Sequence, residues 1–135
     1  MNIALIAHDK KKELMIEFCI AYSGILKKHH LCATSATGTC VEDATGLNVT
    51  KFLSGSQGGG QQIGARISYN EIDLVLFFND PISKHPSEAE VVPIIIACDT
   101  HNVPIATNVA TAEVLVMGLE RGDLNWRDIL REKSS

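Results

Sequence analysis

Short apolar runs alternate with longer mixed segments along the chain. Runs of this length that are rich in aliphatic and β-branched residues predict strands. The predicted strands are residues 3–8, 30–34, 49–53, 72–78 and 103–107. The run IDLVLFF at 72–78 is apolar at nearly every position, which is typical of a strand that is covered on both faces.

The longer segments between these runs predict helices. In residues 10–28 the apolar side chains recur at helical spacing. The other predicted helices are residues 39–46, 61–70, 87–102 and 110–122, with a closing helix or turn at 125–133. Pro93 lies inside the segment 87–102, and a proline there either kinks the helix or belongs to its first turn.

This alternation predicts one α/β domain over residues 1–135, with an open parallel sheet and helices on both of its faces. Such sheets bind ligands at the carboxyl ends of their strands. Most of the polar and glycine-rich signals of the chain follow predicted strands, in the segments AHDKKK, ATSATG, SGSQGGG, FNDPISKHPSE and ATNVAT. We therefore expect the site at this edge of the sheet.

Composition narrows the possible partners. The chain has 45% apolar and 21% charged residues and a formal net charge of −4, so it lacks the basic surface of a nucleic-acid-binding protein. No apolar run is long enough to span a membrane. The amino terminus has a short apolar run followed by charges, the order of a strand and a helix and not of a signal peptide. We expect a cytoplasmic protein without nucleic-acid or membrane partners.

The cysteines predict thiols and no metal centre. Four cysteines are present, at positions 19, 32, 40 and 98, and none forms a C-x-x-C pair. Small buried thiols in a reducing compartment fit this pattern better than disulfides. Together with five scattered histidines they do not favour a zinc site.

Two segments carry candidate anion ligands. His8, Asp9 and Lys12 follow the first predicted strand, and a lysine on a first helical turn can reach back over the sheet edge. Alternatively, lysines 10–12 form a solvated helix face.

The second segment, ATSATG at 33–38, offers hydroxyl groups and a glycine before the amino end of a helix. The amino end of a helix suits the binding of an anion. The alternative role of this segment is capping by Thr37 or Thr39.

The stretch SGSQGGG at 54–60 repeats this arrangement after the next strand. Glycines permit positive φ and close backbone approach, but the stretch matches neither common nucleotide-binding glycine pattern. A flexible turn explains the stretch equally well.

Asp80 follows the strand 72–78. It can act there as a base or an orienting group, although Asp-Pro also starts turns.

Ordered motifs over nearly the whole chain resemble the methylglyoxal synthase family. They are IALIAHDKKK, ATGLNV, SGxxGGxQQIGA, DLVLFFNDP and VPIATNVATAE. The resemblance implies a three-layer α/β/α sandwich with a five-stranded parallel sheet in the order 3-2-1-4-5, and a homohexamer. It also implies conversion of dihydroxyacetone phosphate to methylglyoxal and phosphate without metal or organic cofactor. A carboxylate removes a carbon-bound proton, an enediolate forms, and phosphate is eliminated.

Several family ligand positions are retained. The resemblance assigns His8 and Lys12 to the substrate contacts after the first strand. It assigns Asp80 to an aspartate that lines the family site. The phosphate-loop positions that match are Thr34, Thr37, Gly38, Ser54 and Gly55. Asp9, Ser35 and Ala36 complete the predicted ligand-binding set.

Other family positions have changed. The family reads A-T-G-T-T-G where this chain has Ser35 and Ala36 in place of a glycine and a threonine. The family reads G-G-D-Q-Q, with the aspartate as catalytic base, where this chain has Gly60. After the fourth strand, Ser87 replaces a histidine and Glu90 an aspartate. Loss of a positioned base costs about 10²–10⁴-fold in rate.

These changes favour a family member without efficient turnover, which senses or sequesters a phosphorylated small molecule. A pocket enlarged at Ala36 and Gly60 would admit a nucleotide-like signal, and a viral protein that absorbs such an immune signal would fit. The alternative is an active carbon–oxygen lyase, a methylglyoxal synthase in which Asp80 or Glu90 serves as base. A designed knockout fits less well, because the changes are several and dispersed.

Overall fold

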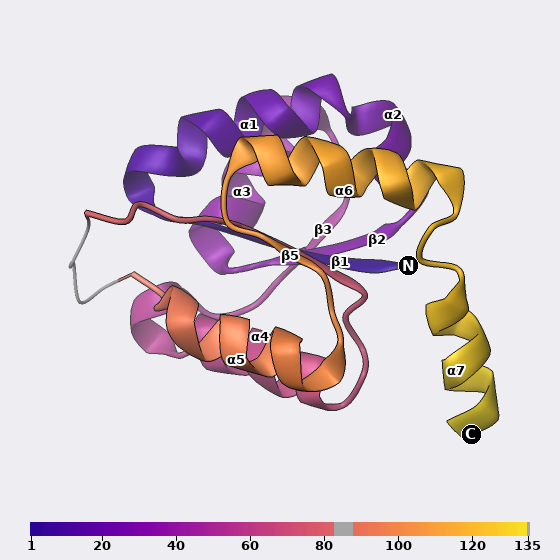
Figure 1. Ribbon diagram of the computed structural model, residues 1–135. Helices are drawn as coiled ribbons and strands as arrows, with labels where there is room; N and C mark the ends of the chain where they lie inside the picture. The colour runs from indigo at the N-terminus through magenta and orange to yellow at the C-terminus, as the bar shows by residue number, and fades with distance from the viewer. Residues whose placement is uncertain (83–87, 135) are drawn as a thin grey trace.

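A five-stranded parallel sheet forms the middle of the molecule (Figure 1). The computed structural model describes residues 1–82 and 88–134. The strands are β1 (Asn2–Ala7), β2 (His30–Ala33), β3 (Val49–Lys51), β4 (Leu74–Phe78) and β5 (Ile105–Ala106). Their order is β3-β2-β1-β4-β5, and in this register Leu5 lies between Ala33 and Leu76. The predicted fold and strand order are confirmed.

Helices cover both faces of the sheet (Figure 1). On one face lie α1 (Lys12–Ala21), α2 (Ser23–Leu26), α3 (Ser35–Thr45) and α6 (Val109–Arg121). On the other lie α4 (Gly59–Ser68) and α5 (Val91–His101). Short 3₁₀ helices η1 (Asp9–Lys11) and η2 (Gly55–Gln57) follow β1 and β3. The last helix, α7 (Trp126–Ser134), lies beside the end of the sheet that holds the amino terminus.

Alternation along the central strands divides the core into two clusters. Ile3 and Leu5 of β1 join the cluster under α1, α3 and α6, whereas Ala4 and Ile6 join the cluster under α4 and α5. Successive strand side chains point to opposite faces, so a strand between two helical layers is apolar at every position. Burial of each such aliphatic side chain contributes about 1.5–3 kcal/mol, which explains the uninterrupted apolar run of β4.

Some predicted element boundaries were wrong. α3 begins at Ser35 and not at residue 39, since Thr34, and neither Thr37 nor Thr39, is the extended N-cap residue. Serine and threonine favour turns in isolation, but burial of Thr37 against the sheet outweighs that preference. The helix predicted at 10–28 is interrupted at Tyr22, just before a Ser-Gly pair of low helix propensity.

Pro93 occupies the first turn of α5, the second of the two places predicted for it. The helix begins at Val91, after an extended Glu90, so the missing N–H of Pro93 falls where helix donors lack an intrahelical acceptor in any case. The predicted helix start at residue 87 lies outside the described residues.

All four cysteines are free thiols, as predicted. Burial raises the pKa of the Cys19 thiol to about 12, so this side chain belongs to the apolar core. Among residues 1–82 and 88–134, none of the helices has the length and apolarity that crossing a bilayer requires.

A buried polar network ties the chain ends to the sheet. Asp73, which is fully buried just before β4, accepts hydrogen bonds from Arg127 Nε at 3.0 Å and from the backbone N–H of Asn2 at 2.8 Å. Arg131 of α7 contacts the same carboxylate. The remaining donors of Arg127 reach the carbonyl oxygen of Asn102 at 2.7 Å and Asn70 Oδ1 at 2.8 Å.

This network determines the charge of Asp73. Burial alone raises the pKa of the carboxyl group, but hydrogen bonds from Asn2, Arg127 and Arg131 outweigh it, and the pKa is lowered overall. Asp73 is therefore an anion held between the first strand and the last helix.

Replacement of Arg127 by leucine will destabilise the protein by about 3–5 kcal/mol, because it leaves a buried carboxylate without its main partner. Chemical unfolding followed by circular dichroism measures this change. Arg121→Leu is the matched control, since that arginine pairs with Asp123 at the surface and its loss will cost at most about 1 kcal/mol. Equal effects of the two substitutions would contradict the network.

Acid will weaken the same network. Because the folded pKa of Asp73 is lowered, its contribution is complete above the unfolded value of about 3.9. The contribution is lost as pH falls through the folded pKa. The difference in unfolding free energy between the wild type and Asp73→Asn will therefore be largest near neutral pH and will shrink below about pH 4. A difference that stayed constant over this range would argue against it.

Candidate functional site

A hollow of about 90 Å³ lies at the carboxyl ends of β1, β2 and β3. Its lining residues come from the segments after these strands and from the segment before α5: Ile6, Ala7, His8, Asp9, Lys12, Thr34, Ala36, Ser54, Gly55, Glu88 and Ala89. We call it the strand-end hollow. It gathers residues from four of the five sequence segments expected to meet at this edge of the sheet, whereas the segment ATNVAT at 106–111 does not line it.

His8 is the most constrained side chain of the strand-end hollow. It is 6% exposed, and its ring meets Phe77 edge-on with centroids 5.3 Å apart. Its Nδ1 accepts the backbone N–H of Asp80 at 3.0 Å, so the proton of the neutral ring lies on Nε2. That Nε2–H donates to the carbonyl oxygen of Ala89 at 2.8 Å. The imidazole is thus fixed in one tautomer, with its donor directed at the wall formed by Ala89.

Lys12 brings a positive charge to the same place. Its Nζ donates to the carbonyl oxygen of Ala7 at 3.1 Å and to Asp9 Oδ1 at 2.7 Å. The side chain therefore reaches back to the end of β1, while Lys10 is exposed. The sequence allowed two roles for the lysines at 10–12, an anion ligand that reaches over the sheet edge or a solvated helix face. Lys12 has the geometry of the first.

The amino end of α3 also opens into the strand-end hollow. Thr34 is the N-cap, but its hydroxyl contacts Thr37 Oγ1 at 3.4 Å and makes no capping bond. The first N–H groups of a helix have no acceptor within it, and they carry the positive end of the helix dipole. Because Thr34 and Ala36 line the hollow, this end can receive an anion.

Other residues of the predicted loop have packing roles. Thr37 Oγ1 accepts the backbone N–H of Ala7 at 3.3 Å. A Cβ on Gly38 would lie 2.9 Å from Lys51 Cγ, so this glycine permits close packing of α3 on β3. Thr37, Gly38 and Ser35 are not among the lining residues of the strand-end hollow, and their role as ligand contacts stays a prediction.

The glycine-rich stretch forms a tight turn into α4. Ser54 and Gly55 line the strand-end hollow, and Ser54 Oγ lies 3.1 Å from Ser56 Oγ. Gly58 has a φ of 101°, which favours glycine. A Cβ on Gly59 would lie 2.0 Å from the carbonyl oxygen of Leu53. Backbone geometry thus explains these glycines without the flexible turn considered from the sequence.

The carboxylates near the strand-end hollow differ in position. Asp80 is buried, and its Oδ1 accepts the backbone N–H of Ile82 at 3.1 Å, so it stabilises a turn as well as holding His8. Glu88 lines the hollow: its Oε1 accepts the backbone N–H of Asp9 at 2.9 Å, and its Oε2 lies 3.6 Å from His8 Nδ1. Glu90 is exposed. Sequence reasoning missed Glu88, because the motif comparison drew attention to its neighbours at 87 and 90.

A second hollow, of about 370 Å³, adjoins the first. The two share Gly55, Glu88 and Ala89, and the second also has Gly60 and Glu90 in its wall. We call it the α4–α5 hollow. Ser87, which holds the family's histidine position in the resemblance, lies outside the described residues.

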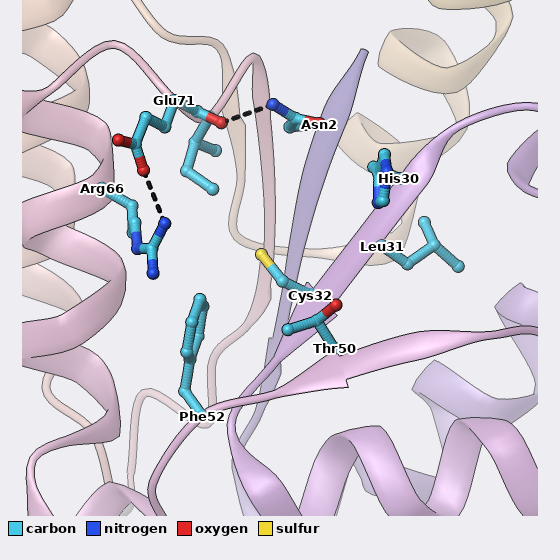
Figure 2. Close-up of a pocket in the computed structure, with 9 residues that line it drawn as sticks. Asn2, His30, Leu31, Cys32, Thr50, Phe52, Arg66 and Glu71 are labelled. Carbon is cyan, nitrogen blue, oxygen red and sulfur yellow. Dashed lines mark hydrogen bonds and ion pairs between the residues drawn. The ribbon is translucent and has the colours of Figure 1, made fainter.

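A further pocket, of about 410 Å³, lies at the opposite end of β2. Figure 2 shows Cys32 and Thr50 on the sheet, with Phe52 and Arg66 near the helix at its side. Arg66 pairs with Glu71 Oε2 at 2.7 Å, and its guanidinium lies 5.5 Å from the Phe52 ring centroid. None of the sequence-predicted site residues lines this pocket.

Comparison with known proteins gives this geometry a context. A family model described as the MGS-like domain matches residues 15–107. The chain belongs to the MGS-like domain family. Methylglyoxal synthase of Caldicellulosiruptor saccharolyticus is 57% identical over 133 residues, covering 98% of this chain and 94% of the relative. That of Thermoanaerobacterium thermosaccharolyticum is 53% identical over 131 residues, covering 97% and 98%.

A solved family structure has the same fold. The crystal structure of methylglyoxal synthase from Elizabethkingia anophelis superposes with a TM-score of 0.82 at 39% identity. The match covers 85% of this chain and 76% of that one.

These relatives overturn one expectation. The hypothesis of a family member that only senses or sequesters a phosphorylated ligand is wrong, since relatives at 51–57% identity over nearly the full chain are methylglyoxal synthases. That hypothesis rested on the changed family positions together: Gly60 for the base, Ser87 for the histidine, and Ser35 and Ala36 in the phosphate loop. The MGS-like fold nevertheless keeps carboxylates at the strand-end hollow, which Asp9 and Glu88 line.

The turn before α4 gives a sharp test of the site geometry. Gly59→Ala will destabilise the protein by about 2–4 kcal/mol, because the added carbon cannot coexist with the Leu53 carbonyl. Gly64→Ala is the control: its Cβ would meet only Ile94 Cδ1, at 3.8 Å. Alanine in a helix interior stabilises by about 0.5–1 kcal/mol over glycine. In thermal unfolding, Gly59→Ala will have a lower midpoint than the wild type and Gly64→Ala a higher one. A Gly59→Ala variant with the midpoint of the wild type would refute the close approach of Gly59 to the Leu53 carbonyl.

Proposed function

We propose that this protein is a methylglyoxal synthase, a carbon–oxygen lyase that converts dihydroxyacetone phosphate to methylglyoxal and phosphate. The observation that carries the proposal is the convergence of His8, Lys12 and the amino end of α3 on one hollow at the strand ends. The full-length relatives named methylglyoxal synthase support the same reaction.

Each group has a role that its geometry suits. The ammonium of Lys12 and the first N–H groups of α3 attract the phosphate dianion. The Nε2–H of His8, in its fixed tautomer, is the donor for the substrate carbonyl oxygen, whose negative charge grows when the adjacent carbon loses a proton. Such preorganised donors lower the barrier most where charge develops.

The remaining family properties belong to this proposal. We expect the reaction to need no metal and no organic cofactor, and the protein to act as a homohexamer in the cytoplasm. The phosphate, once bound, is the leaving group, so tight capture of its charge also favours the elimination step.

Purified protein given dihydroxyacetone phosphate will release methylglyoxal and inorganic phosphate in equal amounts. Lys12→Met will lower kcat/KM by about 10–100-fold, because a hydrogen bond to a charged group contributes about 1.5–3 kcal/mol. Lys10→Met is the matched control, since Lys10 is exposed two residues earlier, and its activity will equal that of the wild type. Absence of product from the wild type would disprove the proposed function.

A further inference from the structure

We propose that Glu88 is the carboxylate that removes the carbon-bound proton of the substrate. This inference rests on the proposed lyase function and names the base for it. Gly60 occupies the position of the family's catalytic aspartate. Glu88 lies instead on the segment that leads into α5.

Glu88 lies at the boundary between the two hollows. It is a lining residue of both the strand-end hollow and the α4–α5 hollow, and its side chain is 11% exposed. The hydrogen bond from the Asp9 N–H fixes Oε1, and Oε2 lies on the His8 side. A carboxylate fixed in this way, beside the imidazole that would polarise the substrate carbonyl, is placed to reach the adjacent carbon.

The other described carboxylates at this edge fit the role less well. Asp9 pairs with the Lys12 ammonium at 2.7 Å and its side chain is 72% exposed. Asp80 does not line either hollow, and its Oδ1 accepts the Ile82 N–H. Glu90 is exposed and lines the α4–α5 hollow alone.

Gly60 packs against the segment that carries Glu88. A Cβ on Gly60 would lie 3.2 Å from Ala89 Cβ, so the segment with Glu88 packs directly on the first turn of α4. A side chain at residue 60 would be tight against Ala89, which would have to shift by a few tenths of an ångström. Glycine permits this close packing, and Glu88, the residue before Ala89, lines the strand-end hollow.

The proposed step balances without any co-reactant. Glu88 takes a proton from the hydroxymethyl carbon, the C–H electron pair enters the carbon–carbon bond, and the carbonyl oxygen becomes an enediolate oxygen. The hydroxyl group then loses its proton and becomes the aldehyde, the electron pair of the carbon–carbon double bond moves to the bond with the phosphate-bearing carbon, and phosphate leaves with the electron pair of the broken carbon–oxygen bond. Of the carbon-bound and hydroxyl protons released, one ends on the terminal carbon, which becomes the methyl group, and the other on phosphate.

Glu88→Gln tests the assignment, with Glu113→Gln as the control, because Glu113 is an exposed glutamate of α6 that lines neither hollow. We expect kcat of Glu88→Gln to fall by about 10²–10⁴-fold, while inorganic phosphate binds with the affinity of the wild type. In D₂O the variant will also lose exchange of the hydroxymethyl hydrogen of dihydroxyacetone phosphate. Glu113→Gln will keep the wild-type kcat, and a loss of kcat in Glu90→Gln larger than that in Glu88→Gln would also overturn the assignment.

A second variant separates chemistry from structure. Glu88→Ala will regain turnover when formate is added, because a small carboxylate can occupy the space of the missing side chain. A structural role would not respond to formate, so absence of rescue would overturn the assignment. An active wild type with a Glu88→Gln variant of equal kcat would overturn it too, while leaving the lyase function intact. An inactive wild type would instead reject the function on which it rests.

Discussion

Parallel pairing of β1 with both β2 and β4 is the constraint on which the site depends. It places the ends of the central strands at one edge, so that His8, Thr34 and Asp80 meet although they are far apart in sequence. The Asp80 N–H then fixes the tautomer of His8, which determines where its donor points. A shift of β4 relative to β1 would remove that donor and release the imidazole.

The opposite edge of the sheet carries the buried ionic network. In this network Asp73, just before β4, binds Asn2 of the first strand and Arg127 of the last helix. Buried ion pairs contribute little net stability, but a broken one is costly, so the network penalises any arrangement in which α7 leaves the sheet. Stabilising charges and reactive charges thus occupy different ends of the same strands.

Apolar patterning was sufficient to predict the strands and their parallel arrangement, because buried strands such as β4 are apolar at every position and so stand out from the rest of the chain. The start of α3 was missed, since serine and threonine near residue 35 favour turns unless tertiary burial offsets that preference. Four of the five expected strand-end segments contribute to the hollow, because parallel topology forces them together, whereas ATNVAT does not. Glu88 belongs to one of these segments, but its role could not be predicted, because the proximity of Glu88 and Ala89 to His8 and Gly60 depends on packing between distant segments.

The hydrogen bond from His8 Nε2 to the Ala89 carbonyl has a consequence for ligand entry. Without substrate, the protein's own backbone carbonyl holds the donor that a substrate carbonyl needs, so the two compete for one proton. An orphaned buried acceptor costs about 1–3 kcal/mol, and any ligand that takes the donor must offset that cost or supply a new partner for Ala89. The segment before α5 therefore acts as an internal competitor: it lowers the affinity of any ligand that takes the His8 donor, and it leaves the binding of phosphate alone unaffected.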